Sequence, residues 1–513
     1  HNIIIKYYNI IRIISPAIRK RTVIFMKYSI IVKILKDNGL LIDCSNIEMN
    51  IKYLSYNSKD IKENTLFFCK GFSFKRKYLE EAISNGIVCY ISETDYQIDL
   101  PKIIVSDIRK ALAIVSLNFY PDKLFKIGIT GTKGKTTTNF YINNILKHHL
   151  GYKPGMLATQ YFYDGKNEGE THLTTPESLE LHKFFQEMDK NKLGYVTMEV
   201  ASQAIKMNRV YGMHYDIGCF LNIGEDHISP IEHEDFADYM RCKIEFLKMC
   251  DKVVINKDTD YYDDIVEEIK DKEIITFGND DSCDYYIKDV NILDDKIDFK
   301  IEHNGETKDY HITMMGSFNV INATCAIAVA DLLGASQESI LKGLDETKVE
   351  GRMDMICDDI GPVIVDFAHN KISADALFKS IKSTYGDRKI IAVFGSPGKR
   401  GISRKRDLGT SAAINADYIY LTEDDGGGFD VVDICKEIAT FIEPYKTPYE
   451  IVPDRKTAIR KALSERKHGD VLVILGKGSE VYQAVSLGYA PYQGDMPIVE
   501  EYMKEVKSKG GNV

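Results

Sequence analysis

The run KIGITGTKGKTTT, residues 126–138, places a glycine-rich loop between an apolar strand and a helix. This is the context that a phosphate-binding loop requires. Glycines at 128, 131 and 134 let the backbone approach a phosphate, and a helix that begins near Lys135 offers unpaired N–H groups with a partial positive charge. The segment therefore predicts an α/β domain that binds a nucleotide.

The loop departs from the common GxxxxGK[ST] spacing, because only two residues separate Gly131 from Gly134. Lys135 still follows directly, where its ammonium can reach the β- and γ-phosphates, and the hydroxyl of Thr136 can ligate Mg²⁺. The alternative is a glycine-rich turn that closes a strand–helix unit without a ligand.

Strands and helices alternate after the loop, with apolar strands expected around YVTMEV, DIGCFLNI and VVIN. Such alternation predicts a mainly parallel sheet covered on both faces. After GRMD at 351–354 the alternation starts afresh with PVIVDFAH, IIAVFGS, DYIYLTED and DVLVILGKG. We therefore expect an α/β chain with a small domain at 26–120, a central domain at 121–353 and a C-terminal domain at 354–513.

Composition restricts the classes of function. A hydrophobic content of 44% and a charged content of 28% are ordinary for a folded chain. The net charge of −10 argues against sequence-independent binding of nucleic acid. Ten cysteines stand singly, without a CxxC pair, and no apolar run is long enough to cross a bilayer. We expect a cytoplasmic protein with no nucleic-acid partner and no stable membrane insertion.

Residues 1–25 differ from the rest of the chain, with five Lys or Arg, no Asp or Glu and many isoleucines. One interpretation is a basic membrane or transit segment. The interpretation that we favour is that Met26 is the true start, so that residues 1–25 are an extra or non-native segment.

Two further strands end in residues that could hold a metal. Glu199 closes the strand within TMEVASQ, and NIGEDHISPIEH supplies Asp226 and His227 after the next strand. Ligands gather at this edge of open α/β sheets. Because Mg²⁺ prefers oxygen ligands, Glu199 is the first candidate and His227 the second, the alternative for His227 being a structural loop histidine.

At this point the motifs GTKGKTTT, LTTPES, MEVASQ, NIGEDHISPIEH, DYMRCKIEF, GSFNVINA, GRMD, DFAHN and GKGSEVYQ resemble those of the Mur ligases, ATP-dependent enzymes that build the peptidoglycan stem peptide. The resemblance runs from Met26 onward in the right order. Within the family the chain looks most like the third ligase, in its lysine-adding streptococcal branch, because of SYNSKDIKENTLFFCKG, LTTPES and EDHISPIEHEDFADY.

The resemblance implies an N-terminal domain for the uridine nucleotide, a central ATPase domain and a C-terminal Rossmann-like domain for the amino acid. It implies an ADP-forming ligase that adds L-lysine to the D-glutamate of UDP-N-acetylmuramoyl-L-Ala-D-Glu through an acyl phosphate, with ATP and Mg²⁺. We expect a monomer.

Site residues carried over from the family fall into four groups. Catalysis would involve Lys135, Glu199, His227 and Lys243. ATP would be bound by Gly131, Thr132, Lys133, Gly134, Lys135, Thr136, Thr137, Asn319, Asn322, Arg352, Asp366 and His369. The UDP sugar would meet Ser58, and the muramoyl dipeptide Thr174, Thr175, Ser202 and Arg209. The metal site would comprise Thr136, Glu199, His227 and a carbamylated Lys243.

For Lys243 and Asn319 the sequence also allows a simpler interpretation. For Asn319 and Asn322 the chemistry of the side chains gives a reason for the role that the resemblance implies. From the sequence alone, Lys243 is a lysine on an amphipathic helix, and such lysines are ordinarily solvated. Asn319 and Asn322 offer the donor and acceptor pair that an adenine edge needs, although Asn319 could instead be a helix N-cap.

The incoming amino acid would meet Lys405, Asp424, Asp425, Gly476 and Glu480. Diaminopimelate-adding relatives carry Asp-Asn-Pro-Arg at the specificity loop, whereas lysine-adding ones carry Asp-Asp-Pro-Asn. The present LTEDDGGGFD keeps both acids, replaces Pro-Asn by Gly426 and Gly427, and has no arginine. Two acids without a guanidinium favour an ammonium, which predicts lysine. Ornithine or another diamino acid satisfies the same argument, and meso-diaminopimelate stays an alternative.

Two competing functions make different predictions. A folylpolyglutamate-type ligase would keep the ATP loop but should lack the uridine-nucleotide domain and LTTPES. A catalytically silent nucleotide-binding regulator should have lost Lys135, Glu199, His227 or Lys243, and all four are present.

Overall fold

The computed structural model describes residues 25–71, 74–159, 161–171, 173–225, 228, 232–293, 296–398, 402–486 and 488–508, with the side chains of 402 and 403 left aside. Apart from Phe25, the basic segment 1–25 lies outside the described residues, as do Asp226 and His227. The chain divides into two compact units. The first runs to Asp122 and also takes in Glu177–Gln186 and Met207–Met213; the remainder forms the second.

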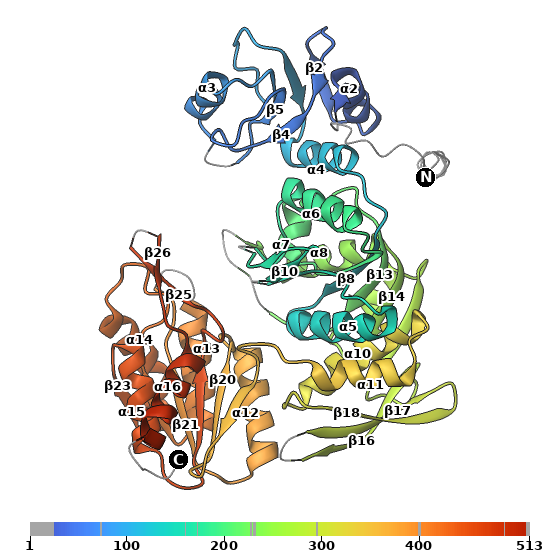
Figure 1. The fold of residues 1–513 in the computed structure, drawn as a ribbon. Coiled ribbons are helices and arrows are strands. Elements are labelled where there is room, and N and C mark those ends of the chain that lie inside the picture. Colours follow the sequence, from blue (N-terminus) through green and yellow to red (C-terminus); the bar gives the residue numbers. More distant parts are fainter. Residues whose placement is uncertain are drawn as a thin grey trace. The chain divides into compact units, whose positions relative to one another are not determined.

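The first unit is built on a five-stranded sheet in the order β2-β7-β6-β5-β4 (Figure 1). Its strands are β2 Leu41–Cys44, β4 Tyr53–Ser55, β5 Thr65–Phe68, β6 Cys89–Ser92 and β7 Lys102–Val105, and a short pair joins β1 Met26–Lys27 to β3 Asn50–Ile51. Its helices are α2 Tyr28–Asp37, α3 Arg76–Ser84 and α4 Ile108–Phe119. Asp107 caps α4 by accepting the N–H groups of Arg109 and Lys110, both at 2.9 Å.

The second unit contains an eleven-stranded sheet in the order β11-β10-β9-β12-β8-β13-β14-β15-β16-β17-β18. The strands are β8 Phe125–Thr130, β9 Gly155–Ala158, β10 Tyr161–Tyr163, β11 Glu168–Gly169, β12 Tyr195–Glu199, β13 Tyr215–Phe220, β14 Cys250–Asn256, β15 Glu273–Gly278, β16 Tyr285–Ile292, β17 Ile297–His303 and β18 Glu306–Ile312. Neighbouring strands pair in parallel along the central run β9-β12-β8-β13-β14-β15-β16. Antiparallel strands extend the sheet at both edges, β10 and β11 at one and β17 and β18 at the other.

Helices accompany this sheet: α5 Lys135–Leu150, α6 Ser178–Lys190, α7 Ser202–Lys206, α8 Phe236–Lys248, α9 Tyr262–Glu268, α10 Phe318–Leu332 and α11 Gln337–Glu346. Helix α6 begins in the first unit and ends in the second. The predicted strand, loop and helix around residues 126–138 are confirmed as β8 followed by α5, and the parallel centre of the sheet is confirmed as well.

A separate six-stranded sheet, ordered β19-β20-β24-β21-β22-β23, follows Asp354. Its strands are β19 Asp354–Cys357, β20 Pro362–Asp366, β21 Ile390–Phe394, β22 Tyr418–Leu421, β23 Tyr449–Ile451 and β24 Val471–Leu475. The helices are α12 Lys371–Tyr385, α13 Ile402–Asn415, α14 Val431–Ile442, the 3₁₀ turn Glu443–Tyr445, α15 Arg455–Glu465 and α16 Asp495–Ser508, and a hairpin joins β25 Tyr482–Val485 to β26 Gly488–Pro491. The predicted α/β class is thus confirmed, while the exact domain boundaries stay a prediction.

Two glycines on neighbouring strands allow close packing against the central sheet. Gly128 of β8 pairs with Gly218 of β13 in register. A Cβ at Gly128 would lie 2.7 Å from the ring of Phe246, and one at Gly218 would lie 2.3 Å from the sulfur of Cys250. Because Phe246 belongs to α8 and Cys250 to β14, Gly128 sets how near α8 packs to β8, and Gly218 makes room for the start of β14.

A fully buried ion pair joins the first residues of α15 and α16 in the C-terminal part of the chain. Arg455 and Asp495 have no exposed side-chain surface, and Arg455 donates to both carboxylate oxygens at 2.8 Å. Replacing Arg455 by methionine leaves the carboxylate buried without its partner, and we expect a loss of about 3–5 kcal/mol of stability, seen as a lower Tm. The matched control is Arg460→Met, whose partner Glu505 is 39% exposed, with an expected loss below about 1 kcal/mol. Equal Tm shifts for the two variants would contradict this account.

Candidate functional site

The phosphate loop has the geometry that its glycines predict. Gly134 precedes α5 in the left-handed region, with φ 85°, and a Cβ there would lie 2.3 Å from Oδ1 of Asn322. Lys135 folds back over the loop, where its Nζ donates to the carbonyls of Gly131 at 2.8 Å and Thr132 at 3.2 Å. The loop therefore presents its lysine above a helix N-terminus, the arrangement that binds phosphate.

Two side chains from outside the loop hold it in shape. Asn222, just after β13, accepts the N–H of Lys133 at 2.8 Å and donates to its carbonyl at 3.1 Å. The hydroxyls of Thr132 and Tyr239 lie 3.0 Å apart. Neither Asn222 nor Tyr239 was predicted as a site residue, although both stand inside motifs that the sequence analysis singled out.

Glu199 lies at the end of β12, beside the loop, and its side chain is buried. Its Oε1 accepts the hydroxyl of Thr136 and the N–H of Thr159, both at 2.8 Å, and its Oε2 accepts the hydroxyl of Thr159 at 3.1 Å. The structure thus brings Thr136 and Glu199 into direct contact. Their oxygens form the hard donor set that Mg²⁺ prefers.

Lys243 is buried, in contrast to the solvated position that is ordinary for a lysine of an amphipathic helix. Its Nζ lies 3.5 Å from the hydroxyl of Thr130, at the end of β8, and 4.7 Å from the centre of the Tyr239 ring. The lysine therefore stands at the carboxyl end of the strand that leads into the phosphate loop. His227, the fourth predicted member of the metal site, lies outside the described residues.

Two of the predicted dipeptide-binding residues flank Glu199. The hydroxyl of Thr175 donates to the carbonyl of Glu199 and accepts the N–H of Ala201, both at 3.0 Å. The hydroxyl of Thr174 lies 3.1 Å from that of Thr159, which itself contacts the Glu199 carboxylate.

Ser202 is oriented by a hydrogen-bonded chain that the sequence did not predict. Its Oγ lies 2.9 Å from Nε2 of the fully buried His233, and Nδ1 of His233 lies 2.9 Å from Oδ2 of Asp238. Burial raises the pKa of Asp238, but its hydrogen bonds with Lys206, His233 and Arg241 outweigh burial and hold that pKa well below the usual range.

His233, Asp238 and Cys242 lie close enough together to bind a metal ion in principle. However, both ring nitrogens of His233 are already in hydrogen bonds, and two cationic side chains, Lys206 and Arg241, contact the carboxylate of Asp238. This cluster is therefore an ion network around Ser202, and no metal is assigned to it.

In the first unit, Ser58 directly follows Asn57, which lines a small pocket. Its hydroxyl donates to Glu81 at 2.7 Å. The pocket is lined by Ser55, Tyr56, Asn57, Asp60, Leu179 and Glu180. Arg209 belongs to the same unit and donates to Glu177 at 3.1 Å, a carboxylate that also pairs with Lys70.

The side-chain amides of Asn319 and Asn322, the two residues predicted to bind adenine, are hydrogen-bonded to each other. Asn322 donates to Asn319 at 3.0 Å, and Asn319 donates to the carbonyl of Met315 at 2.7 Å. Helix α10 begins at Phe318, so Asn319 lies in its first turn and is not its N-cap.

The remaining ATP-site candidates cluster around β20. The guanidinium of Arg352 lies 4.7 Å from the centre of the Phe367 ring, and Nδ1 of His369 lies 2.8 Å from the Phe367 carbonyl. Asp366 accepts the N–H groups of Met353 and Ala368, both at 2.8 Å. Burial raises the pKa of Asp366, and the nearby charge of Arg352 opposes that rise.

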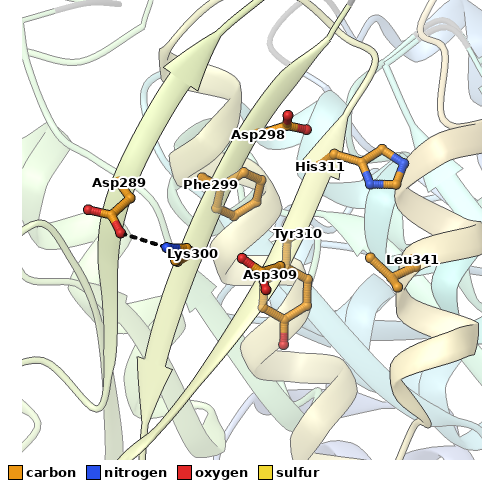
Figure 2. Close-up of a pocket in the computed structure, with 8 residues that line it drawn as sticks. All are labelled: Asp289, Asp298, Phe299, Lys300, Asp309, Tyr310, His311 and Leu341. Carbon is orange, nitrogen blue, oxygen red and sulfur yellow. Dashed lines mark hydrogen bonds and ion pairs between the residues drawn. The ribbon is translucent and has the colours of Figure 1, made fainter.

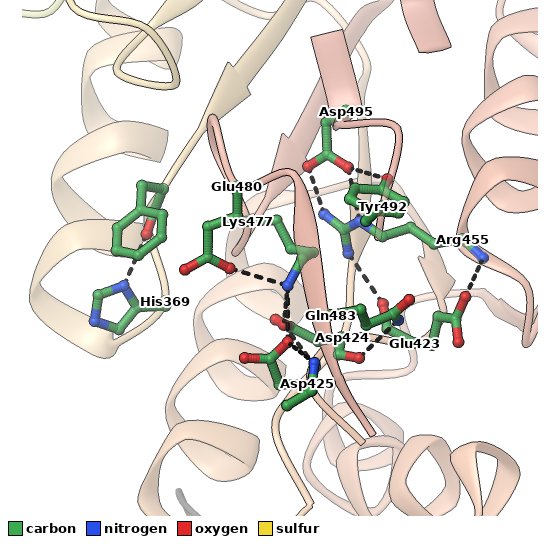
Figure 3. Close-up of polar contacts among 12 residues, drawn as sticks. His369, Glu423, Asp424, Asp425, Arg455, Lys477, Glu480, Gln483, Tyr492 and Asp495 are labelled. Carbon is green, nitrogen blue, oxygen red and sulfur yellow. Dashed lines mark hydrogen bonds and ion pairs between the residues drawn. The ribbon is translucent and has the colours of Figure 1, made fainter. Parts of the chain in front are cut away.

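Three of the predicted amino-acid-binding residues converge on a lysine that was not predicted (Figure 3). Nζ of Lys477 lies 2.9 Å from Asp425 and from Glu480, and 3.5 Å from Asp424. A Cβ at Gly476 would lie 2.9 Å from Asp424, so the fourth candidate borders the same cluster. The fifth, Lys405, is buried on α13 and pairs with Glu437.

The two glycines of the specificity loop differ in how well they match the residues they replace. Gly427 has φ 60°, a left-handed conformation that asparagine adopts more readily than most other residues. Gly426 donates its backbone N–H to the carbonyl of Asp424 at 3.0 Å, a hydrogen bond that a proline at this position could not make.

Another pocket lies away from these residues, on the β16–β17–β18 meander and α11 (Figure 2). Its lining is Asp289, Asp298, Phe299, Lys300, Asp309, Tyr310, His311 and Leu341, with an ion pair of 3.0 Å between Asp289 and Lys300. None of the residues predicted for the site is among them.

Within the described ranges, no helix combines the length and the apolar character that a bilayer span demands.

The sheet topology and the phosphate loop are those of an α/β protein built to bind a nucleotide, and comparison with known proteins gives the family. Residues 129–330 match the Mur ligase middle domain, and residues 351–478 match the Mur ligase glutamate ligase domain. The chain belongs to the Mur ligase family of ATP-dependent, ADP-forming ligases.

Two relatives illustrate the similarity. The UDP-N-acetylmuramoyl-L-alanyl-D-glutamate–L-lysine ligase of Streptococcus thermophilus is 40% identical over 462 residues, which cover 88% of this chain and 92% of the relative. The ligase of the same name from Streptococcus pneumoniae serotype 2 is 36% identical over 494 residues, which cover 93% of this chain and all of the relative.

Solved structures share the fold. A UDP-N-acetylmuramoyl-L-alanyl-D-glutamate–2,6-diaminopimelate ligase superposes with a TM-score of 0.64 at 22% identity, over 89% of this chain and 95% of that one. A MurF ligase from Thermotoga maritima in complex with ADP gives a TM-score of 0.60 at 17% identity, over 89% of this chain and 98% of that one.

Proposed function

We propose that this chain uses ATP to attach L-lysine to the D-glutamate of UDP-N-acetylmuramoyl-L-Ala-D-Glu, with release of ADP and phosphate. The observation that carries the choice of amino acid is the cluster of Asp424, Asp425 and Glu480. Relatives named for this reaction, similar over nearly the whole chain, support the proposal independently.

The first step activates a carboxylate. The γ-carboxylate of the D-glutamyl residue attacks the γ-phosphorus of ATP, the bond to the β-phosphate oxygen breaks, and an acyl phosphate and ADP form. The ammonium of Lys135 and the N–H groups at the start of α5 are placed to stabilise the charge that develops on the phosphates.

Mg²⁺, held by Thr136 and Glu199, would shield the negative charges of the phosphates while they react. His227 and a carbamylated Lys243 complete the proposed metal site. The burial of Lys243 beside Thr130 supports a specific role for this side chain, since a solvated lysine needs no such position.

The second step forms the amide. The amine of the incoming amino acid attacks the acyl carbon, a tetrahedral intermediate collapses, and phosphate leaves with the C–O bond electrons. Thr174, Thr175 and Ser202 lie near the Glu199 end of β12 and would hold the dipeptide on which this carbon sits.

Lysine is favoured over diaminopimelate because the nearby guanidinium is already occupied. Arg455 donates to both oxygens of Asp495, to the carbonyl of Leu475 at 2.8 Å and to that of Glu423 at 3.2 Å. Arg455 therefore has few N–H groups left to bind the distal carboxylate of diaminopimelate, whereas the acidic cluster suits the distal ammonium of lysine.

Phosphate release tests the proposal directly. With ATP, Mg²⁺ and UDP-N-acetylmuramoyl-L-Ala-D-Glu present, we expect release with L-lysine and little with meso-diaminopimelate. L-Ornithine, one methylene shorter, should be used with a higher KM. Turnover with diaminopimelate alone would refute the assignment of lysine, and no release with any diamino acid would refute the ligase function.

Two properties of the intact protein complete the proposal. We propose that the chain acts as a monomer and in the cytoplasm. Light scattering at the assay concentration measures the first, and a mass close to 58.3 kDa is the expected result.

A further inference from the structure

The amino-acid site contains an ammonium of the protein itself. Lys477 has no exposed side-chain surface, whereas Glu480 is 12% exposed and Asp425 is 27% exposed. The ammonium of Lys477 is therefore less exposed than the carboxylates that it contacts, and Figure 3 shows it beside Asp425 and Glu480.

In both Asp425 and Glu480, the ammonium of Lys477 contacts one of the two carboxylate oxygens. Lys477 contacts Oδ1 of Asp425 and Oε2 of Glu480, and Oδ1 of Asp425 also accepts the N–H of Ala484 at 3.0 Å. Among the described residues, these hydrogen bonds fall on the inner oxygen of each carboxylate. Oδ2 of Asp425 and Oε1 of Glu480 are the oxygens that remain for a ligand.

The charges of the cluster do not cancel. Three carboxylates surround one ammonium, and the adjacent Arg455 is matched by Asp495. Burial by itself lowers the pKa of Lys477, but the carboxylates of Asp424, Glu480 and Asp425 outweigh burial and raise that pKa above its ordinary value, so the side chain stays charged. The surplus of two negative charges suits a ligand with ammonium groups.

We infer that Lys477 is a positioning residue for the incoming amino acid: it fixes the inner oxygens of Asp425 and Glu480, so that their outer oxygens accept the ammonium groups of the substrate. This inference rests on the proposed function. It also explains why acids so close together stay in place, because like charges would otherwise repel or take up protons.

Lys477→Met tests the inference, since it keeps the length of the side chain and removes the charge. Truncating one partner of a buried charge pair is costly, and we expect the KM for L-lysine to rise by about 30-fold or more. The KM values for ATP and the uridine nucleotide should stay within about threefold, and the matched control Lys456→Met, whose lysine is 42% exposed and pairs with Glu501, should match the wild type.

A pH profile separates positioning from simple stabilisation. Burial raises the pKa of Glu480 and Lys477 lowers it; Asp425 and Asp424 are the other charged groups that act on it. Without Lys477 the pKa of Glu480 rises further, so the KM of Lys477→Met for lysine should fall from pH 6 to pH 8.5, while that of the wild type should change little.

The outcomes are distinct. A rise in all three KM values together, or a fall in kcat with the KM for lysine unchanged, would overturn the inference. If Lys477→Met does not fold, Lys477→Arg takes its place, because it keeps the charge but displaces it; a rise confined to the KM for lysine supports the inference, and an unchanged KM refutes it. Failure of the proposed function would show differently, as a wild-type enzyme without lysine-dependent phosphate release.

Discussion

Replacement of Lys135 by methionine is expected to lower kcat by about 10²–10³-fold while the protein stays folded. The Nζ of Lys135 lies over the loop, 2.8 Å from the carbonyl of Gly131, where it can neutralise the phosphates of ATP as charge develops on them. Methionine keeps the length of the side chain and loses the charge. Steady-state phosphate release with saturating lysine measures the effect.

Lys147→Met is the matched control, because Lys147 lies on the same helix, is 43% exposed and pairs with Glu346 at the surface. It should keep wild-type kcat. Comparable losses in both variants, or a Lys135→Met enzyme with normal kcat, would refute the role of Lys135.

Replacement of Lys243 by alanine should lower activity by about 10²-fold, and a small carboxylate such as formate or acetate should restore part of it. The reason is that a carbamate would place a negative charge at this buried position near Thr130, and alanine leaves space for a free anion. Activity is measured against formate concentration, with chloride at equal ionic strength as the anion control.

Lys248→Ala provides the control on the same helix, since Lys248 is 37% exposed and pairs with Glu245 and Glu268. In addition, wild-type protein equilibrated with ¹³C-labelled bicarbonate should give a carbamate resonance that Lys243→Ala lacks. Rescue by chloride as well as formate would show a non-specific anion effect and remove the support for a carbamate, and the absence of that resonance would mean that Lys243 acts as an amine.

The phosphate site could be predicted from the sequence because its parts are local. The strand, the glycines and Lys135 follow one another within residues 125–135, and Glu199 ends the strand that pairs with that strand. Short-range patterns of this kind determine their own geometry, since a loop between a strand and a helix has few possible shapes.

The partners of the amino-acid site could not be predicted in the same way. Lys477 and Glu480 are three residues apart, but Asp425 is 52 residues from Lys477, and only the fold brings them together. The sequence therefore indicated the acids but not their pairing with an ammonium of the protein itself.

The burial of individual side chains could not be predicted from the sequence either. An amphipathic pattern shows that α8 has two faces, but it does not show that Lys243 lies at the end of β8. In the same way, NIGEDHISPIEH contains two histidines, and the pattern singled out His227, whereas contacts with Ser202 and Asp238 distinguish His233.

Gly128 and Gly218 carry no functional group, yet natural selection for turnover should act on them. Gly128 sets how near α8 packs to β8, and α8 carries both Tyr239, which touches the phosphate loop, and Lys243. An alanine at Gly128 would shift the helix and move both side chains at once, whereas an alanine at Gly218 would displace Cys250 at the start of β14. Surveys of variants should therefore find these two strand glycines as intolerant of change as the residues that contact the nucleotide.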